Sequence, residues 1–575
     1  IGFAKSGAGE YTFSIFAVVA IALVVSWFVA VIFAPVIGKA IVRAPKAKAT
    51  DRPDFIQRVY TPILRTAMRM RWLTIALTVA AFALALFAVR FIPQQFFPAS
   101  DRPELVVDLT LPQSASIFAS EATAERLDAI LKDDSDVAQW STYVGRGAIR
   151  FYLPLNVQLP NEFFSQVVII AKDVAARERL HARLEQVLAE KFPDVVSRVY
   201  PLELGPPVGW PIQYRVHGPD PEQVRAIALR VAQTLAGHAS VRNINYDWME
   251  PKRQLRVRID QDQARQLGVS SQSLAATLNA AVVGATITQV RDGIYLVDVV
   301  ARATADERIS VDTLRNLQVP LPSGRTVALS QFATFNFGQE LPLIWRRDRV
   351  PTLTVRADVA HGALAEPVVS EIAPDIAALN GELRNPYRID TGGIVEESAQ
   401  SRASVLAVVP VMILLTLMVL MFHLKSFQRV ILVLAVVPLG LIGVVASLLL
   451  FNRPLGFVAI LGILSLLGMV AKNGVILLTQ IEADRAEGQA IWEAVISASS
   501  SRVRPILLTA GSTVLGLIPI APTVFWGPMA FAIMGGLLVA SVLTLVFLPT
   551  LYVTWFRGEE GAADPSPSTK TPASV

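Results

Sequence analysis

The chain has 575 residues, of which 53% are hydrophobic and 17% are charged, and its formal net charge at pH 7 is +5. Soluble chains carry about 25% charged residues, and here the deficit falls in residues 13–92 and 401–556, so the composition excludes a simple soluble enzyme, a disordered chain and a fibrous repeat. Cys is absent, which excludes disulfide scaffolds, Cys-based zinc sites, Fe–S clusters and thiol catalysis.

The first residue is Ile1 and not Met, within a Gly/Ser-rich stretch, so we expect a fragment of a longer protein. Seven apolar runs are long enough to cross about 30 Å of hydrocarbon, which takes about 20 helical residues. A basic block follows the first run, which argues against a cleaved signal peptide. The runs are Phe13–Val36, Trp72–Ile92, Val405–Phe422, Val430–Phe451, Leu455–Ile481, Pro505–Phe525 and Pro528–Trp555.

Lys and Arg are concentrated in alternate loops, which marks the cytoplasmic side of a membrane protein. Residues 37–71 contain nine of them against Asp51 and Asp54, and further Lys and Arg residues follow the third and fifth runs. The pattern predicts residues 1–36 as a periplasmic stub and a transmembrane helix, 72–92 as the second helix and 401–556 as five more. Residues 93–400 would then lie outside, and 557–575 would form a cytoplasmic, disordered tail.

The basic block contains apolar residues at helical spacing, among them Phe55, Val59, Ile63 and Met70. This spacing fits a helix on the inner leaflet with its arginines near anionic headgroups. A plain basic tether that sets the topology explains the same residues, and the sequence leaves both interpretations open.

Residues 93–400 have an ordinary soluble composition in which strand-like and helical stretches alternate. A strand–helix–strand pattern recurs, which predicts α+β subdomains at 93–205 and, split, at 206–250 with 342–400. Residues 251–341, with a helix and a hairpin-like pair, read as an insert. The predicted strands are Glu104–Leu111, Ser165–Ala171, Ile212–His217, Val241–Tyr246, Leu353–Val359 and Tyr387–Thr391, and the predicted helices are Ala115–Leu131, Ala175–Lys191, Pro221–Ala236, Ser271–Val283 and Pro367–Leu379.

Few residues of this domain form a chemical motif. No phosphate-binding GxxxxGK[ST] occurs, so ATP is not expected to drive this chain directly, and no metal or cofactor is predicted. The histidines are scattered without metal-ligand spacing, which favours binding or conduction over catalysis. They are His181, His217, His238, His361 and His423.

Lys472 lies well inside the fifth apolar run. Placing an ammonium there costs about 2.5–3.5 kcal/mol, and no Asp or Glu lies within any of the seven runs. One interpretation is a lysine that snorkels to the inner interface, across about 13 Å of helix. The other is an ion or proton relay whose carboxylate partners lie on a missing segment.

Arg502 and Arg504 precede the sixth run, which begins at Pro505, where the first turn of a helix tolerates proline. Thr509, one turn later, could bond a relay water or its own backbone. The arginines mark a cytoplasmic mouth or anchor the helix. Glycines in these helices permit close helix approach, and we interpret most of them as packing residues. They are Gly440, Gly443, Gly462, Gly468, Gly474, Gly511, Gly516, Gly535 and Gly536.

These features resemble the proton-driven efflux transporters of the resistance–nodulation–cell-division (RND) superfamily, in the hydrophobe and drug branch. The stretch 468–475 around Lys472 resembles the relay lysine motif, and 502–509 resembles the motif with the relay threonine. Residues 97–103 look like the entry to the porter domain, and Val257–Leu267 with Ser271–Val283 looks like the start of the docking subdomain. The resemblance covers the C-terminal half of such a pump.

The resemblance implies a polytopic helical protein of the bacterial inner membrane, with ferredoxin-like porter subdomains and an inserted docking subdomain. It implies a homotrimer that works with a periplasmic adaptor and an outer-membrane channel. It assigns the proton relay to Lys472, Asn473, Thr509 and Arg502. It implies antiport of protons against hydrophobic drugs, and hence antibiotic resistance, with no enzymatic activity and no cofactor.

Two departures from the family matter. The paired aspartates that accompany the relay lysine would precede Ile1, so the chain as given is not expected to transport by itself. In residues 147–160 the usual Gly/Phe-rich loop is replaced by a segment with Arg150, Phe151 and Tyr152. These residues either line the substrate path or, for the aromatics, pack a strand.

Alternatives remain. A heavy-metal exporter of the same superfamily would need thioether ligands for monovalent copper or silver, and Met249 is the only methionine between residues 93 and 400, which disfavours it. A non-pumping secretion accessory or sensor with the same helical core is a further possibility, and a membrane enzyme lacks any nucleophile motif.

Overall fold

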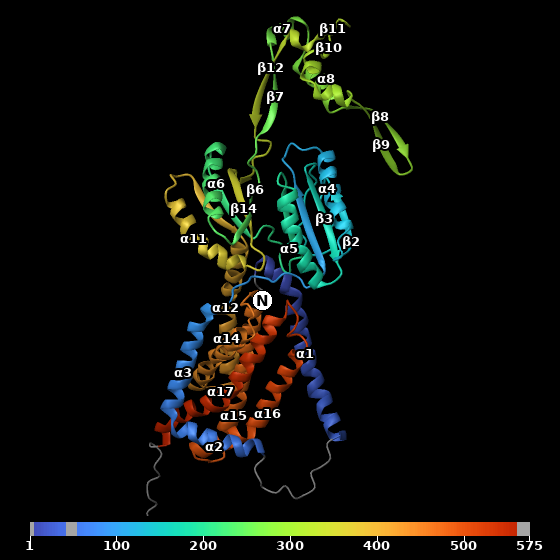
Figure 1. Cartoon of the computed structure of the whole chain (residues 1–575). Helices are drawn as coiled ribbons and strands as arrows, with labels where there is room; N and C mark the ends of the chain where they lie inside the picture. Colours follow the sequence, from blue (N-terminus) through green and yellow to red (C-terminus); the bar gives the residue numbers. More distant parts are fainter. Residues whose placement is uncertain (1–4, 42–54, 561–575) are drawn as a thin grey trace, which may run out of the picture. The chain divides into compact units, whose positions relative to one another are not determined.

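The computed structural model describes residues 5–41 and 55–560 (Figure 1). The chain divides into two compact units: the residues up to Asp247 together with those from Trp345 onward form the first, and Trp248–Ile344 form the second. Residues 42–54 of the predicted basic block, and the predicted tail from residue 561, lie outside the described residues.

Six helices of the described residues are long and apolar enough to cross a membrane. They coincide with six of the seven predicted runs, although several continue beyond them. These segments are α1 (Gly7–Ile41), α3 (Arg71–Ala88) with the short 3-10 turn η1 (Val89–Phe91), α12 (Ile394–Leu424), α13 (Phe427–Val436) and α14 (Gly440–Leu450) joined by η3 (Val437–Leu439), α15 (Phe457–Ala486) and α17 (Gly527–Glu560).

Small residues allow α14 and α17 to pack backbone against backbone. A Cβ atom on Gly443 would lie 2.1 Å from the carbonyl oxygen of Gly535, a distance at which no side chain fits. The interpretation that most of the glycines are packing residues is confirmed, because six of the nine have an atom within 4 Å of a built Cβ. The other three, Gly468, Gly511 and Gly516, have no such atom within the described chain.

The remaining predicted run, the sixth, corresponds to α16 (Ile491–Leu517), whose bounds differ from the prediction. The helix begins well before Pro505, which therefore lies in its interior and not in its first turn, and turns follow from residue 518. The earlier start arises because Ile491, Val495 and Ala498 form an apolar stripe at helical spacing that is buried against the other helices. The apolar run alone did not show this amphipathic extension.

Helix α2 (Phe55–Arg69) covers the ends of α16 and α17. Its buried side consists of Tyr60, Leu64 and Met68, and the Tyr60 hydroxyl donates to the carbonyl oxygen of Leu545 at 2.6 Å. The apolar residues at helical spacing noted in the sequence, Phe55, Val59, Ile63 and Met70, are exposed. The segment is thus a helix packed on the bundle, and its exposed apolar side remains compatible with the inner-leaflet interpretation.

The first sheet has the strand order β2-β3-β1-β4, with antiparallel neighbours throughout. Side chains alternate along β1: Leu105, Val107 and Leu109 join the core against the helices, while Val106 and Asp108 face the other side. The order is that of a ferredoxin-like βαββαβ unit. Its elements are β1 (Glu104–Thr110), α4 (Ile117–Lys132), β2 (Val137–Val144), β3 (Phe164–Ala171), α5 (Val174–Lys191) and β4 (Val196–Pro201).

The second sheet repeats this plan, with β14 and β5 at its centre. Strands β6 and β13 both pair with β14, β6 near its end and β13 at its start. The elements are β5 (Ile212–His217), α6 (Pro221–Ala236), β6 (Val241–Tyr246), β13 (Arg346–Arg347), β14 (Val350–Val359), α11 (Ala365–Gly381) and β15 (Arg388–Gly393).

The compact unit Trp248–Ile344 enters between β6 and β13, close to the bounds of the predicted insert, 251–341. The hairpin-like pair is present as β8 and β9, which are exposed along their length. The unit contains β7 (Lys252–Ile259), α7 (Gln261–Gln266), α8 (Ser271–Val282), β8 (Ala285–Asp292), β9 (Tyr295–Ala301), α9 (Ala305–Ile309), α10 (Val311–Arg315), β10 (Gln318–Pro320), β11 (Thr326–Ala328), η2 (Leu329–Gln331) and β12 (Ala333–Glu340).

Candidate functional site

Lys472 projects from the exposed side of α15, whereas its neighbour Asn473 is buried. Within residues 5–41 and 55–560, no hydrogen bond or ion pair involves the Lys472 ammonium. The adjacent Gly474 packs against Val433 and Leu548. Within a transmembrane run, an ammonium on this side requires a counter-charge from outside the described residues, the lipid headgroups or water.

Thr509 is also exposed, on α16. Its hydroxyl donates to the carbonyl oxygen of Pro505, one turn earlier, at 2.7 Å. This is the bond to the i−4 carbonyl that a threonine hydroxyl often makes within a helix. The structure therefore has the backbone hydrogen bond that was one of the two predicted roles of this hydroxyl.

Arg502 belongs to a different polar group from Lys472. Its Nε donates to Oε1 of Gln480 at 3.2 Å, and the Gln480 amide donates to the buried carboxylate of Asp484 at 2.6 Å. Gln480 lies eight residues after Lys472 on α15, which corresponds to about 12 Å of helix. The four predicted relay residues are thus not brought into one cluster within the described chain.

A second polar group at this end of the bundle was not predicted. The carboxylate of Glu482 accepts from Arg429 at 2.6 Å and from the hydroxyl of Tyr552 at 2.6 Å, and Arg485 donates to that hydroxyl at 2.8 Å. Since these residues come from α13, α15 and α17, the group ties three helices together.

The predicted substrate-path residues lie in the irregular segment between β2 and β3. Arg150 and Phe151 are exposed, while Tyr152 is half-buried against the apolar cluster around Leu155. The guanidinium of Arg102 lies 5.3 Å from the centre of the Tyr152 ring. Packing within a strand is therefore wrong for these aromatics, because the segment is not a strand.

A cavity of about 300 Å³ lies between the two ferredoxin-like units. Its apolar wall includes Phe96, Phe97 and Tyr200. The remaining wall is rich in groups that can be charged. These are Glu178, His181, Glu185, Arg198, Glu203, Asp358, His361 and Glu366.

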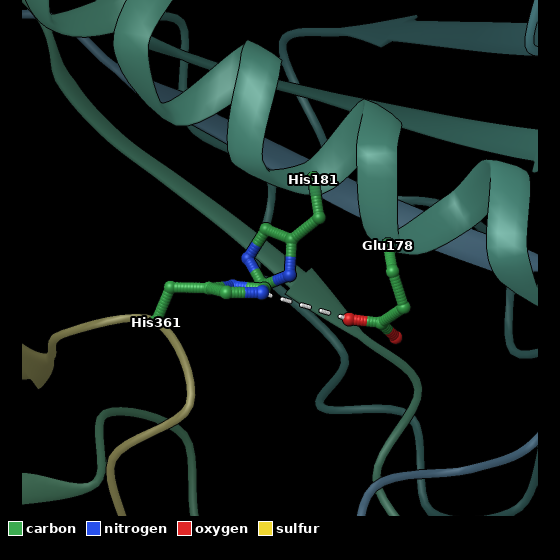
Figure 2. A group of neighbouring side chains, drawn as sticks. All are labelled: Glu178, His181 and His361. Atoms are coloured by element: carbon green, nitrogen blue, oxygen red, sulfur yellow. Dashed lines mark ion pairs between the residues drawn. The ribbon is translucent and has the colours of Figure 1, made fainter.

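Three of these side chains, Glu178, His181 and His361, converge (Figure 2). Each offers a donor atom within 4.8 Å of the other two. The Nε2 of His361 lies 3.9 Å from Oε2 of Glu178, and the two imidazole rings meet edge to face with centroids 5.0 Å apart. The cluster joins α5 of the first ferredoxin-like unit to the segment after β14 of the second ferredoxin-like unit.

Local sequence explains how both elements present these groups. Asp173 caps α5 by accepting from the N–H of Ala176 at 2.7 Å, and Glu178, His181 and Glu185 then follow at spacings that share one helix face. His361 occupies a tight turn in which Gly362 takes a φ of +79°, a value that suits glycine.

Further contacts orient the cluster. Nε2 of His181 lies 3.1 Å from the carbonyl oxygen of Val199 and 3.3 Å from the Glu185 carboxylate. Burial would raise the pKa of Glu185, but the hydrogen bond from His181 and the nearby positive groups outweigh it and hold that pKa below its usual value. Glu178 accepts from the Nε of Arg177 at 3.1 Å through its other oxygen, Oε1.

Beside the cluster, Arg198 forms an ion pair with Asp358 at 3.0 Å, and Glu203 lies 3.9 Å away from the same guanidinium. Burial raises the pKa of Glu203, although Arg198 opposes the shift. Burial also raises the pKa of Asp108 to about 6, against hydrogen bonds from Gln166 and Tyr200. This acidic network was absent from the prediction.

The sequence pattern predicted the histidines to be scattered, and this is wrong for His181 and His361. The signal that could have pointed to the site is local: Glu178, His181 and Glu185 lie at i, i+3 and i+7 on one helix. The third member of the cluster could not be found in this way, because only the fold brings His361 to the other two.

The family model described as the AcrB/AcrD/AcrF family matches residues 7–555. The nickel and cobalt resistance protein CnrA of Cupriavidus metallidurans is 25% identical over 86% of this chain and 47% of its own length. The cobalt-zinc-cadmium resistance protein CzcA of the same organism is 24% identical over 88% of this chain and 49% of its own length.

A crystal structure of a heavy metal efflux pump has the same fold, with a TM-score of 0.72 and 22% sequence identity, over 87% of this chain and 51% of that one. The chain thus spans about half the length of the relatives that it matches. A family match over nearly the whole chain agrees with the resemblance based on the motifs around Lys472 and Thr509. The chain belongs to the AcrB/AcrD/AcrF family of RND permeases.

Proposed function

We propose that this chain forms part of a proton-driven exporter of divalent heavy-metal cations. The observation that carries the proposal is the convergence of Glu178, His181 and His361 at an acidic cavity between the two ferredoxin-like units. Names of relatives such as CnrA and CzcA agree with this substrate class. Export of hydrophobic drugs, the main prediction from the sequence, has weaker support.

The lack of methionines other than Met249 between residues 93 and 400 disfavours export of soft monovalent ions only. Thioether ligands select Cu(I), but imidazole and carboxylate ligands suit Zn²⁺, Co²⁺ and Ni²⁺. A lone Met249 is therefore no argument against a divalent cation. Histidine and glutamate provide the ligands that methionine does not.

The membrane part would supply the energy. In this proposal Lys472 and its neighbour Asn473 take part in a proton relay with Thr509, and Arg502 marks the cytoplasmic mouth. The exposed ammonium of Lys472 requires a counter-charge, and carboxylates on a segment outside this chain would supply it. The exporter would act as a secondary transporter and not as an enzyme.

Family membership supports a proposal for the assembly. We propose a homotrimer in the bacterial inner membrane, with residues 93–400 in the periplasm and the C-terminus in the cytoplasm. Trp248–Ile344 would be the docking subdomain, and the two ferredoxin-like units would be porter subdomains. A periplasmic adaptor and an outer-membrane channel would complete the export route.

The test is transport by a whole exporter that contains this chain, in inside-out vesicles energised by a pH gradient. We expect uptake of ⁶⁵Zn²⁺ or Co²⁺ that stops when an uncoupler removes the gradient. Vesicles without the exporter are the control. Uptake that persists with the uncoupler, or that equals the control, would contradict the proposal.

Export of hydrophobic compounds remains a second candidate because of one observation. Ile149, Phe151 and Leu153 are 61%, 42% and 71% exposed on one irregular segment, a concentration of apolar surface that suits an amphiphilic ligand. Uptake of a hydrophobic dye by the same energised vesicles, with no metal uptake, would favour this candidate over metal export.

A further inference from the structure

We propose that Glu178, His181 and His361 bind one divalent cation of the borderline class, such as Zn²⁺, Co²⁺ or Ni²⁺, at a transit site that bridges the two ferredoxin-like units. That the cation passes through this site during export rests on the proposed function. The binding itself is a separate claim and has its own test.

The donor atoms are close to the geometry that such an ion needs. Their mutual distances lie within 4.8 Å, and in a tetrahedral zinc site with bonds of about 2.0–2.1 Å the ligands are about 3.3 Å apart. Side-chain rotations that shorten these distances by at most about 1.5 Å therefore complete the site. His361 and Glu178 have the room for them, since their side chains are 41% and 46% exposed.

His181 already has the orientation of a metal ligand. Metal-binding histidines usually donate their second ring N–H to a carbonyl or carboxylate. Here the Nε2 lies 3.1 Å from the Val199 carbonyl and 3.3 Å from Glu185. The other nitrogen, Nδ1, lies on the side of His361 and Glu178 (Figure 2), where its lone pair is available to a cation.

The charges around the site favour a cation. The cavity wall also carries the carboxylates of Glu185, Glu203 and Asp358, with Arg198 as a basic counterpart. Arg177 engages Oε1 of Glu178 and leaves Oε2 facing His361. Two imidazoles and one carboxylate suit borderline divalent metals better than Ca²⁺, Mg²⁺ or Cu(I).

The number of ligands suits transit better than storage. Three protein ligands leave a fourth position open to water, as in zinc sites that exchange ligands, whereas structural sites are closed by four. The half-exposed Glu178 and His361 keep that position accessible from the cavity. A cation can thus enter and leave without unfolding the site.

The first experiment measures Zn²⁺ binding to the purified full chain in detergent, by competition with a chromophoric chelator. We expect one site whose affinity falls at least tenfold in His181→Ala, His361→Ala and Glu178→Gln, and by about 10-fold to 100-fold in Glu185→Gln, which acts through His181. The matched control is His238→Ala, a histidine that lies 3.2 Å from Asp375. Unchanged affinity in the three ligand variants would overturn the site.

A second variant shows that any loss is not due to misfolding. Because the chain has no Cys, His361→Cys introduces a single thiol at the site. Bound Co²⁺ should then give a thiolate-to-cobalt charge-transfer band that is absent from the unsubstituted chain and from His238→Cys. Absence of this band in His361→Cys contradicts coordination at residue 361.

Transport separates the site from the proposed function. If a whole exporter takes up Zn²⁺ and His361→Ala slows that uptake at least tenfold, the site lies on the route. If the chain binds Zn²⁺ through the cluster but no exporter containing it moves metal, the proposed function fails and the site stands. If uptake is normal in His361→Ala, transit through the site is wrong.

Discussion

The Nε of Arg198, at the end of the first sheet, donates to Oδ2 of Asp358, in the second sheet, at 3.0 Å. Both side chains are largely removed from solvent, with 8% and 20% exposed. This ion pair joins the two ferredoxin-like units beside the Glu178 cluster. Because the pair lies in the cavity wall, a change in its charges should alter the free energy of unfolding as well as the binding of a cation.

Asp358→Asn should lower the free energy of unfolding by about 2 kcal/mol. Breaking a fully buried ion pair costs about 3–5 kcal/mol because one charge stays buried, and here the partial exposure of Asp358 and the nearby Glu203 reduce the loss. Denaturant unfolding of the purified chain in detergent measures it. Asp262→Asn, in the exposed pair with Arg265, is the control and should change stability by less than about 0.5 kcal/mol.

The double variant Arg198→Met/Asp358→Asn tests the cause. Since it removes both buried charges, it should be more stable than Asp358→Asn alone. A double variant that is less stable than the single one would contradict the electrostatic explanation.

Asp108 should make stability depend on pH. Burial raises its pKa from an ordinary 3.8 to about 6, so the folded state binds the proton more tightly than the unfolded state. Its contribution to stability is complete below about pH 4 and is lost as the pH rises through 6, with a total of up to about 3 kcal/mol.

Asp108→Asn keeps the shape of the neutral carboxyl and cannot ionise. We therefore expect it to be more stable than the unsubstituted chain at pH 7.5, with the difference shrinking toward pH 4. Thermal unfolding across this pH range, with the exposed Asp101→Asn as control, measures the effect. A difference that does not vary with pH would contradict the shift in pKa.

Lys472→Ala should abolish metal uptake by a whole exporter without changing its amount in the membrane. Lys472→Arg should also fail, because guanidinium does not release a proton near neutral pH, whereas the exposed Lys425→Arg should transport normally. Substantial proton-dependent uptake in Lys472→Arg would show that only the positive charge matters and would end the relay interpretation.

Gly443→Ala should destabilise the helical bundle, because the added methyl carbon would lie 2.1 Å from the carbonyl oxygen of Gly535. Overpacking of this kind costs about 1–3 kcal/mol. Gly511→Ala is a matched control with no atom within 4 Å of the new carbon, and it should keep or slightly raise stability, since alanine favours helix. Equal thermal stability of the two variants would contradict the close packing of α14 and α17.

Phe151→Ala addresses the second candidate function. If hydrophobic compounds pass this segment, the variant should change export of some compounds in a panel more than others, while Zn²⁺ uptake stays the same. A uniform lack of effect across the panel would remove Phe151 from any substrate path. The half-buried Tyr152→Phe, which retains the ring, serves as the control.

Periodicity was informative wherever an element buries one face. The alternation along residues 104–111 and the helical spacing in 175–191 predicted β1 and α5 within about one residue, since each contributes a buried row to the same core. Hydropathy was weaker at the ends of the transmembrane helices. It placed Pro505 in a first turn because it cannot detect the amphipathic turns that precede it in α16.

The site was harder to predict than the fold. Glu178, His181 and Glu185 share a helix face that is visible in the sequence, but His361 reaches them only through the packing of two sheets. The prediction of substrate class rested on thioether ligands, whereas the donor atoms that the fold brings together in the Glu178 cluster are nitrogen and oxygen. Lys472, in contrast, could be singled out from the cost of placing an ammonium in an apolar run.

The compact unit Trp248–Ile344 is inserted between β6 and β13 in a way that bears on how genes of this kind evolve. The N–H of Asp247 donates to the carbonyl oxygen of Thr354 at 3.2 Å, and the N–H of Thr352 donates to the carbonyl oxygen of Trp345 at 2.9 Å. Strands β6 and β13 are therefore two segments of one edge strand along β14, and the interruption lies opposite Leu353. One residue in place of Trp248–Ile344 would rejoin them in register. A gene encoding such an exporter can therefore gain, lose or exchange this unit as a cassette while the sheet that carries it keeps its pairing.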